Sequence, residues 1–340
     1  MLSLVGCGSA ALPAIAIEHN RAGTEHLAAH RLDEAEARFR LALEYRSRFA
    51  EPHANLGLVE YLRGHLDEAE AHLRAAIDLN EDFAAAWANL GVVLEQQHRS
   101  VDARQAYERA LDIDPAQTGA RRNLAFLLAR DELFIEARAH LMRLVEMDPS
   151  DAQADAVLAW CDLRLDRPEH AMERANSILS RNPNEATALL VRGAAAAARG
   201  DLDGAYQDLL IAREHSAFAV AATHRLASVE LLRGHIVETR AIITQLLRND
   251  DRDVVAHWLG GSIALVERDR EAARRHALAV LALRPTMQEP HVILAYVALL
   301  DGNVREVHRE LDLITEIRFR GHKARILALL QPSRSNAQMW

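Results

Sequence analysis

The chain has 340 residues, of which half are hydrophobic and 5% aromatic, and its formal net charge is −9. Fifteen glycines and nine prolines are too few for a collagen-like or disordered chain, and abundant alanine favours packed helices over a β-sheet. The negative charge lies in residues 16–151, which carry 16 arginines against 25 acidic residues, so this half repels nucleic acid and favours a protein or peptide partner, above all a basic one.

The two cysteines, Cys7 and Cys161, are too few for a disulfide framework and show no metal-binding spacing. No apolar run reaches the roughly 18 residues that a membrane-spanning helix needs. A chain of this length suggests two or three globular domains unless it is an array of repeats.

Residues 1–15 form an apolar N-terminal segment. Within it, Leu4-Val5-Gly6-Cys7 resembles a bacterial lipobox, which implies that Cys7 is lipidated and that the protein is an outer-membrane lipoprotein facing the periplasm. A secretory signal also has a basic region and an apolar stretch, whereas only six uncharged residues precede Cys7. Three possibilities stay open: a start upstream, a shortened sequence, or an accidental match in a cytoplasmic protein whose segment caps the first helix.

From residue 16 to about residue 321 the chain repeats every 34 residues without an insertion. Position 20 of the repeat is alanine in seven of nine repeats, and position 27 is apolar throughout. Position 8 is always small: Gly23, Gly57, Gly91, Ala125, Ala159, Gly193, Ala227, Gly261 and Ala295. A fixed period of this length indicates stacked supersecondary units.

Each repeat is predicted to be two helices with a turn near position 15, where Gly64, Gly200, Gly234 and Gly302 permit a positive φ. Small residues at positions 8 and 20 would let the two backbones approach closely. Bulky residues at positions 4, 7, 11 and 24 would fill the remaining space. Because one repeat cannot bury its apolar face alone, stability comes from stacking of neighbours.

The pattern W-x-x-L-G-x-x-L followed by A-x-x-x-Y-x-x-A-x-x-x-x-P in residues 87–115 resembles the tetratricopeptide repeat. The resemblance covers about 306 residues and implies an all-α fold, an α-solenoid wound as a right-handed superhelix of about nine helix-turn-helix units. The units are expected in residues 16–321, starting at residues 16, 50, 84, 118, 152, 186, 220, 254 and 288. A capping helix over 322–331 and a flexible tail over 332–340 are expected to follow.

No catalytic motif, cofactor-binding loop or metal-ligand spacing is present, so we expect no enzyme activity, cofactor or metal ion. His26 and His30 lie on one helical face, but Leu27 stands where a zinc protease motif has glutamate. The histidines at position 4 are expected to be packing residues with one ring nitrogen bonded: His19, His53, His257 and His291. His65 and His235 follow glycine and are expected at the turn surface.

Function is therefore expected on the concave face, which in tetratricopeptide arrays is lined by the first helix of each repeat. Position 6 is Asn55, Asn89 and Asn123 in three successive repeats, and this ladder resembles the asparagine-lined array of the O-linked N-acetylglucosamine transferases. A carboxamide both donates and accepts, so the ladder can bind the backbone of an extended peptide. The neighbouring groove residues are predicted to be Tyr61, Glu95, Gln96, Arg122 and Arg130. From the fifth repeat on, position 6 is mostly apolar and suits a partner helix.

The resulting hypothesis is a non-catalytic scaffold that binds a partner segment in this groove; with a lipidated Cys7 it would resemble outer-membrane assembly factors for pili or secretion machinery. The alternatives are a cytoplasmic regulatory or co-chaperone-like adaptor and the accessory half of an enzyme such as a glycosyltransferase. The family's lysine- and arginine-based carboxylate clamp is not recognisable, because Lys323 is the only lysine.

Overall fold

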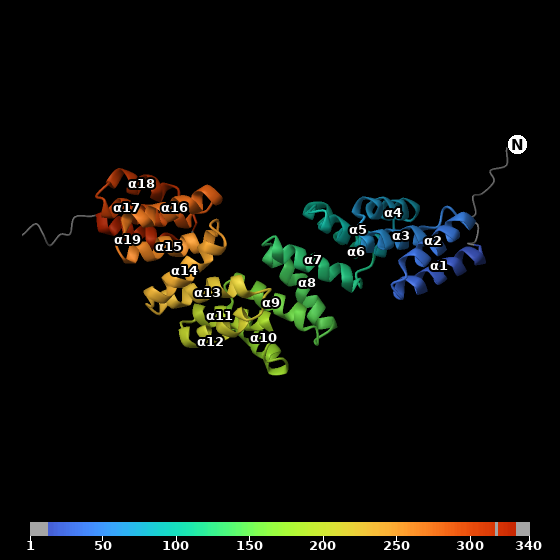
Figure 1. The fold of residues 1–340 in the computed structure, drawn as a ribbon, viewed down its shortest axis with the longest axis horizontal. Helices are drawn as coiled ribbons and strands as arrows, with labels where there is room; N and C mark the ends of the chain where they lie inside the picture. Colours follow the sequence, from blue (N-terminus) through green and yellow to red (C-terminus); the bar gives the residue numbers. More distant parts are fainter. Residues whose placement is uncertain (1–12, 317–318, 331–340) are drawn as a thin grey trace, which may run out of the picture. The chain divides into compact units, whose positions relative to one another are not determined.

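The protein, seen in a computed structural model, is an all-α solenoid (Figure 1). The structure describes residues 13–316 and 319–330, and within them it has nineteen helices and no strand. The chain divides into two compact units, Met1–Arg167 and Pro168–Trp340. The first holds α1 (Ala14–Ala28), α2 (Leu32–Tyr45), α3 (Ala50–Arg63), α4 (Leu66–Leu79), α5 (Ala84–Gln96), α6 (Ser100–Ile113), α7 (Thr118–Arg130), α8 (Phe134–Met147) and α9 (Ala152–Arg164). The second holds α10 (Pro168–Arg181), α11 (Ala186–Ala198), α12 (Leu202–Arg213), α13 (Ala219–Leu232), α14 (Ile236–Asn249), α15 (Val254–Val266), α16 (Arg270–Leu283), α17 (Glu289–Leu300), α18 (Val304–Asp312) and α19 (Arg320–Leu330).

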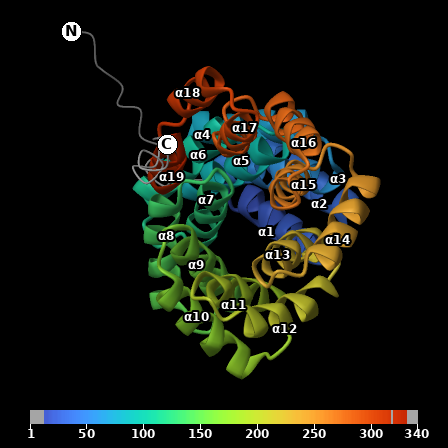
Figure 2. The same ribbon diagram turned by 90° about the vertical axis from the view of Figure 1, so that its left-hand side faces the viewer.

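Each unit is built of antiparallel helix pairs whose first helices also contact one another (Figure 2). In the first unit these contacts join α1 to α3, α3 to α5, α5 to α7 and α7 to α9. In the second unit they join α11 to α13, α13 to α15, α15 to α17 and α17 to α19. The first helices therefore form a continuous layer within each unit, and residues at one repeat position recur along that layer.

The small residue at position 8 faces the side chain at position 24 of the same repeat. A Cβ atom on Gly91 would lie 2.5 Å from Cε1 of Tyr107, and one on Gly57 would lie 2.7 Å from Cγ of Leu73 and 3.1 Å from the Ala69 carbonyl oxygen. Ala69 occupies position 20, so the expected close approach of backbones is present. At Gly57 and Gly91, however, the closest atoms belong to the large side chain at position 24, which fills the space that a side chain at position 8 would need.

The turn between the two helices of a repeat uses one backbone conformation throughout the described residues. Position 15 has a positive φ at the four predicted glycines, with 84° at Gly64. It is equally left-handed at five other residues, which the sequence did not single out: His30, His98, Glu132, Asp166 and Arg268. The turn geometry is therefore set by the helix pair, and glycine only adopts it more easily.

In three repeats, position 4 holds the linker that enters the repeat. Nε1 of Trp87 donates to the carbonyl of Glu81 at 2.9 Å, and Arg121 donates to the carbonyl of Pro115 at 2.6 Å. Nε2 of His257 lies 2.9 Å from the carbonyl of Asp251. In these three repeats the acceptor is six residues earlier, so position 4 is there a hydrogen-bond donor as well as the packing residue that the sequence indicated.

The two turn histidines are half-exposed but have a partner. His65 and His235 each place Nδ1 against the carboxylate five residues earlier, Glu60 at 2.8 Å and Glu230 at 2.6 Å. Both carboxylates are buried and also receive an arginine. The prediction of turn surface was thus incomplete: these histidines complete a repeated Glu–Arg–His contact.

At the ends of the chain, Cys7 and the predicted tail 332–340 lie outside the described residues. The last described helix, α19, packs on α17. None of the helices that the structure describes combines the length and apolar character needed to cross a bilayer.

Candidate functional site

The candidate site is the asparagine face of the first unit, which we define by Asn55, Asn89 and Asn123. These residues occupy the same repeat position on α3, α5 and α7, whose successive contacts align them along one layer. All three side chains are half-buried. A half-buried carboxamide can still present a donor and an acceptor to a ligand.

Asn55 is partly engaged within the protein. Its Nδ2 donates to Oδ1 of Asn20 on α1 at 3.0 Å. This bond extends the row of carboxamides by one helix, to a residue that the sequence did not place in the groove. It uses one of the two N–H groups of Asn55 and leaves its carbonyl oxygen as an acceptor.

Asn123 belongs to a polar cluster with Tyr107, Glu95 and Arg130. The Tyr107 hydroxyl donates to Oε2 of Glu95 at 3.1 Å and also bonds the side chain of Asn123. Nη1 of Arg130 donates to Oε1 of Glu95 at 2.7 Å. Burial, followed by the Glu95 charge, raises the pKa of Tyr107 far above its usual range, so this phenol stays protonated. The cluster fixes Asn123 and Glu95 at the surface of the first-helix layer.

Arg122 forms an inter-helix contact of its own. It pairs with Asp151, the N-cap residue directly before α9, at 2.5 Å. Burial would raise the pKa of Asp151, but the bond from Arg122 and the backbone N–H of Ala154 hold it below its usual range. Arg122 is therefore committed to joining α7 to α9 and offers little charge to a ligand.

The remaining predicted residues, Asn89, Gln96 and Tyr61, differ in their exposure and in their contacts. No hydrogen bond or ion pair of the Asn89 carboxamide is found among the described residues. Gln96 is exposed at the end of α5, and Tyr61 packs against the core cluster of this unit. Asn89 thus carries the largest unused hydrogen-bonding capacity of the asparagine face, with two donors and one acceptor.

Two contributors were missed by sequence reasoning. Tyr107 was interpreted as a packing residue because position 24 is apolar in most repeats, and its hydroxyl was the available signal. Asn20 lies one position away from the asparagine ladder, so the period did not reveal it. In the part of the chain that the structure describes, no group of three or more histidine, cysteine or carboxylate side chains is arranged to hold a metal ion.

Comparison with known proteins agrees with this architecture. Models of the tetratricopeptide repeat match residues 20–80, 55–118 and 94–161. A tetratricopeptide repeat protein from Parabacteroides merdae superposes with a TM-score of 0.61 at 18% identity, covering 73% of this chain and 98% of that one. YrrB, described as a tetratricopeptide repeat protein with an unusual peptide-binding site, gives 0.51 at 22% identity, covering 55% and 96%. PilW, a type IV pilus biogenesis factor, gives 0.50 at 19% identity, covering 64% and 99%. No curated protein matches the chain.

The helix pairs and the layer of first helices define an α-solenoid of helical hairpins. The repeat models identify residues 20–161 as tetratricopeptide repeats, and helical hairpins continue in the described residues to α18. Proteins of this family bind protein or peptide partners and are typically non-catalytic. At these identities, the solved structures support the fold alone.

Proposed function

We propose that this protein is a non-catalytic scaffold that binds an extended segment of a partner protein along the asparagine face. The observation that carries the proposal is the row of Asn55, Asn89 and Asn123 on contacting helices, with the Asn89 carboxamide unused. Carboxamides spaced along one layer can pair with successive peptide groups of an extended chain.

The contacts inside the protein suggest how such binding would be selective. Asn55 and Asn123 are held by Asn20 and Tyr107, so their amide groups need not be ordered when a ligand arrives. Fixed carboxamides recognise the peptide backbone, which every sequence shares. Selectivity for the partner would then come from charge, and the acidic excess of residues 16–151 favours a basic segment.

The test starts from peptides selected on the protein from a random display library, with affinities measured by fluorescence polarisation. Replacing Asn55, Asn89 and Asn123 together by alanine should raise Kd by about tenfold to a hundredfold, because each lost hydrogen bond contributes about 0.5–1.5 kcal/mol. Methylating the backbone nitrogens of the bound peptide should weaken binding similarly, since its main chain is what the asparagines contact.

A matched control replaces three exposed asparagines of the second unit by alanine: Asn182, Asn184 and Asn249. This variant should bind the selected peptides like the wild type. Circular dichroism should show equal helicity and melting for both triple variants. Equal affinity of the wild type and the asparagine-face variant for every selected peptide would refute the proposal.

A further inference from the structure

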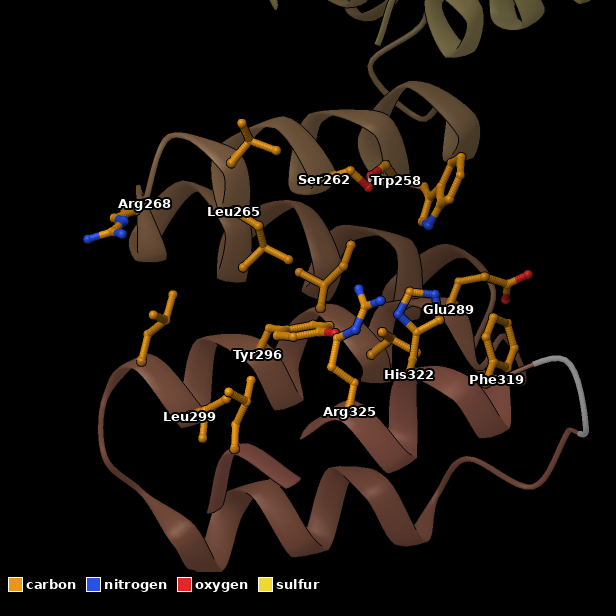
Figure 3. A pocket seen from close by; sticks show the side chains of 15 residues that line it. Trp258, Ser262, Leu265, Arg268, Glu289, Tyr296, Leu299, Phe319, His322 and Arg325 are labelled. Atoms are coloured by element: carbon orange, nitrogen blue, oxygen red, sulfur yellow. Dashed lines mark hydrogen bonds between the residues drawn. The ribbon is translucent and has the colours of Figure 1, made fainter. Parts of the chain in front are cut away.

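The second unit contains a cavity of about 590 Å³ between α15, α17 and the last helix α19 (Figure 3). Its walls are mostly apolar, with Leu265 from α15, Tyr296 and Leu299 from α17, and Leu329 from α19. Cavities of about 300–1,000 Å³ are typical of ligand sites. The cavity lies on the layer of first helices, the surface that corresponds in its own unit to the asparagine face.

Exposed apolar side chains continue this cavity along one edge. Leu232, Val266 and Leu300 occupy the same repeat position on α13, α15 and α17, and their exposed fractions are 65%, 63% and 47%. Leu329 of α19 is 61% exposed. Val266, Leu300 and Leu329 are part of the cavity wall, and Leu232 continues the apolar row onto α13. A contiguous group of exposed apolar residues is typical of an interaction site, whereas scattered ones are common on any protein surface.

The charges at this cavity favour one sign of ligand. Arg325 points from α19 into the space beside Tyr296, and Arg268 lies at the opposite end of the cavity with its guanidinium directed outward (Figure 3). Neither guanidinium has an ion pair or side-chain hydrogen bond within the described residues. The acidic residue of the lining, Glu289, is already engaged in a contact within the protein. His322 meets the Tyr296 ring edge-on, with 6.4 Å between the ring centroids.

From these observations we propose that the cavity is a second binding site, which takes an acidic, apolar helical segment of a partner protein. Leucine-like side chains would fill the space between α15 and α17, and carboxylates beside them would pair with Arg325 and Arg268. The site is independent of the asparagine face: it lies in the other unit, is apolar where that face is polar, and selects the opposite ligand charge. A helix laid into an apolar groove uses side chains at helical spacing as anchors, and the cavity together with the exposed apolar row offers the surface for such anchors.

The experiment uses three fluorescein-labelled peptides that share one stripe of leucines at helical spacing and carry glutamate, glutamine or lysine at the flanking positions. With the full-length protein, the glutamate peptide should bind about tenfold more tightly than the glutamine peptide, and the lysine peptide more weakly still. The double substitution Arg268→Gln and Arg325→Gln should abolish this preference without changing helicity. Arg305→Gln, at an exposed residue of α18 outside the cavity, is the matched control and should retain the preference.

Further variants show whether the cavity itself holds the peptides. The variant with alanine at Asn55, Asn89 and Asn123 should bind the glutamate peptide unchanged, so the outcome does not depend on the first proposal. Leu265→Glu should abolish binding of all three peptides if the cavity is the site. Equal affinity for the three peptides, or loss of the preference in Arg305→Gln, would overturn the proposal. A tenfold gain in affinity on removing residues 331–340 would also overturn it, in favour of an occupant from the chain itself.

Discussion

Gly91 lies on α5 at the point where the ring of Tyr107, a residue of α6, packs against that helix. A Cβ atom there would stand 2.5 Å from one ring carbon and 2.6 Å from another. The ring cannot retreat without cost, because Tyr107 is fully buried and its hydroxyl is bonded to Glu95. The size of one residue thus controls both the packing of a hairpin and the polar cluster at the candidate site.

We therefore expect Gly91→Ala to lower the free energy of unfolding by about 1–3 kcal/mol, the usual cost of overpacking a core. The measurement is urea unfolding followed by circular dichroism. Gly119→Ala is the matched control: no atom lies within 4 Å of its would-be Cβ, so the helix propensity of alanine should leave stability equal or higher. An unchanged unfolding midpoint for Gly91→Ala would contradict this account of position 8.

At the scale of the hairpin, the turn imposes a left-handed residue at position 15. His98 has a φ of 61° there, whereas Gly64 has 84°. A residue with a Cβ is destabilised by roughly 1 kcal/mol or more in this region, whereas glycine is not. Hairpins with and without glycine at this position are otherwise built alike, so the chain offers an internal comparison.

The substitution His98→Gly should raise the free energy of unfolding by about 0.5–1 kcal/mol, because relief of the left-handed strain exceeds the extra flexibility of glycine in the unfolded chain. The reverse substitution Gly64→Ala should lower it by a similar amount. Both positions are exposed, and no atom lies within 4 Å of a Cβ on Gly64, so packing does not confuse the result. Thermal melting of both variants checks this pair, and shifts of the same sign would contradict it.

The linkers between hairpins depend on a contact that sequence patterns do not show. Trp87, Arg121 and His257 differ in shape and charge, yet each donates to a carbonyl six residues earlier. Their shared property is an N–H group that reaches backwards along the chain. The sequence predicted position 4 as packing, with one ring nitrogen bonded where it is histidine. It did not identify the acceptor, because the path of the linker, which brings the carbonyl within reach, is a tertiary feature.

Across the whole molecule, neutral imidazoles are built into several hairpins. Burial lowers the pKa of His53, His72, His140 and His276 below the ordinary 6.5. Three of them face a second histidine: the rings of His53 and His72 lie 5.8 Å apart, and Nδ1 of His276 lies 3.0 Å from Nδ1 of His257. Nε2 of His257 faces the carbonyl of Asp251 and therefore carries a proton. In the neutral ring its Nδ1 is then an acceptor, so the contact between the two Nδ1 atoms needs one proton only, on His276. A second proton would place two N–H groups against each other.

The stability of the protein should therefore decrease below about pH 6.5. The folded state has the lower histidine pKa, so the unfolded chain binds more protons as the pH falls from 6.5 toward the folded-state pKa, and protonation favours unfolding. Urea midpoints at pH 7.5 and pH 5.5 measure this loss. His72→Gln removes one titrating ring and should make stability depend less steeply on pH. Glu60 and Glu36 act to raise the pKa of His72, but burial outweighs them. An equally steep dependence in that variant would contradict the assignment to His72.

For the asparagine face, the sequence predicted which helices carry the asparagines but not the side-chain contacts around them. The period placed Asn55, Asn89 and Asn123 on corresponding helices, which the structure joins by direct contacts. It did not reveal that Arg122 is committed to Asp151, or that Tyr107 links Asn123 to Glu95. Side-chain partners of this kind join residues 12 to 29 positions apart in different helices, so their distances depend on how the helices pack.

The repeat by itself determined that the chain folds as paired helices with small residues at their crossings, because helix formation and hairpin packing depend on residues within one 34-residue period. Only the tertiary structure decided which polar side chains remain available and where an apolar cavity opens. That cavity brings Leu265 and Leu329 together across 64 residues of chain, and α19, which lies beyond the last repeat, closes it. A periodic pattern carries no information about a segment outside the period, so this site became visible only when α15, α17 and α19 were placed in space.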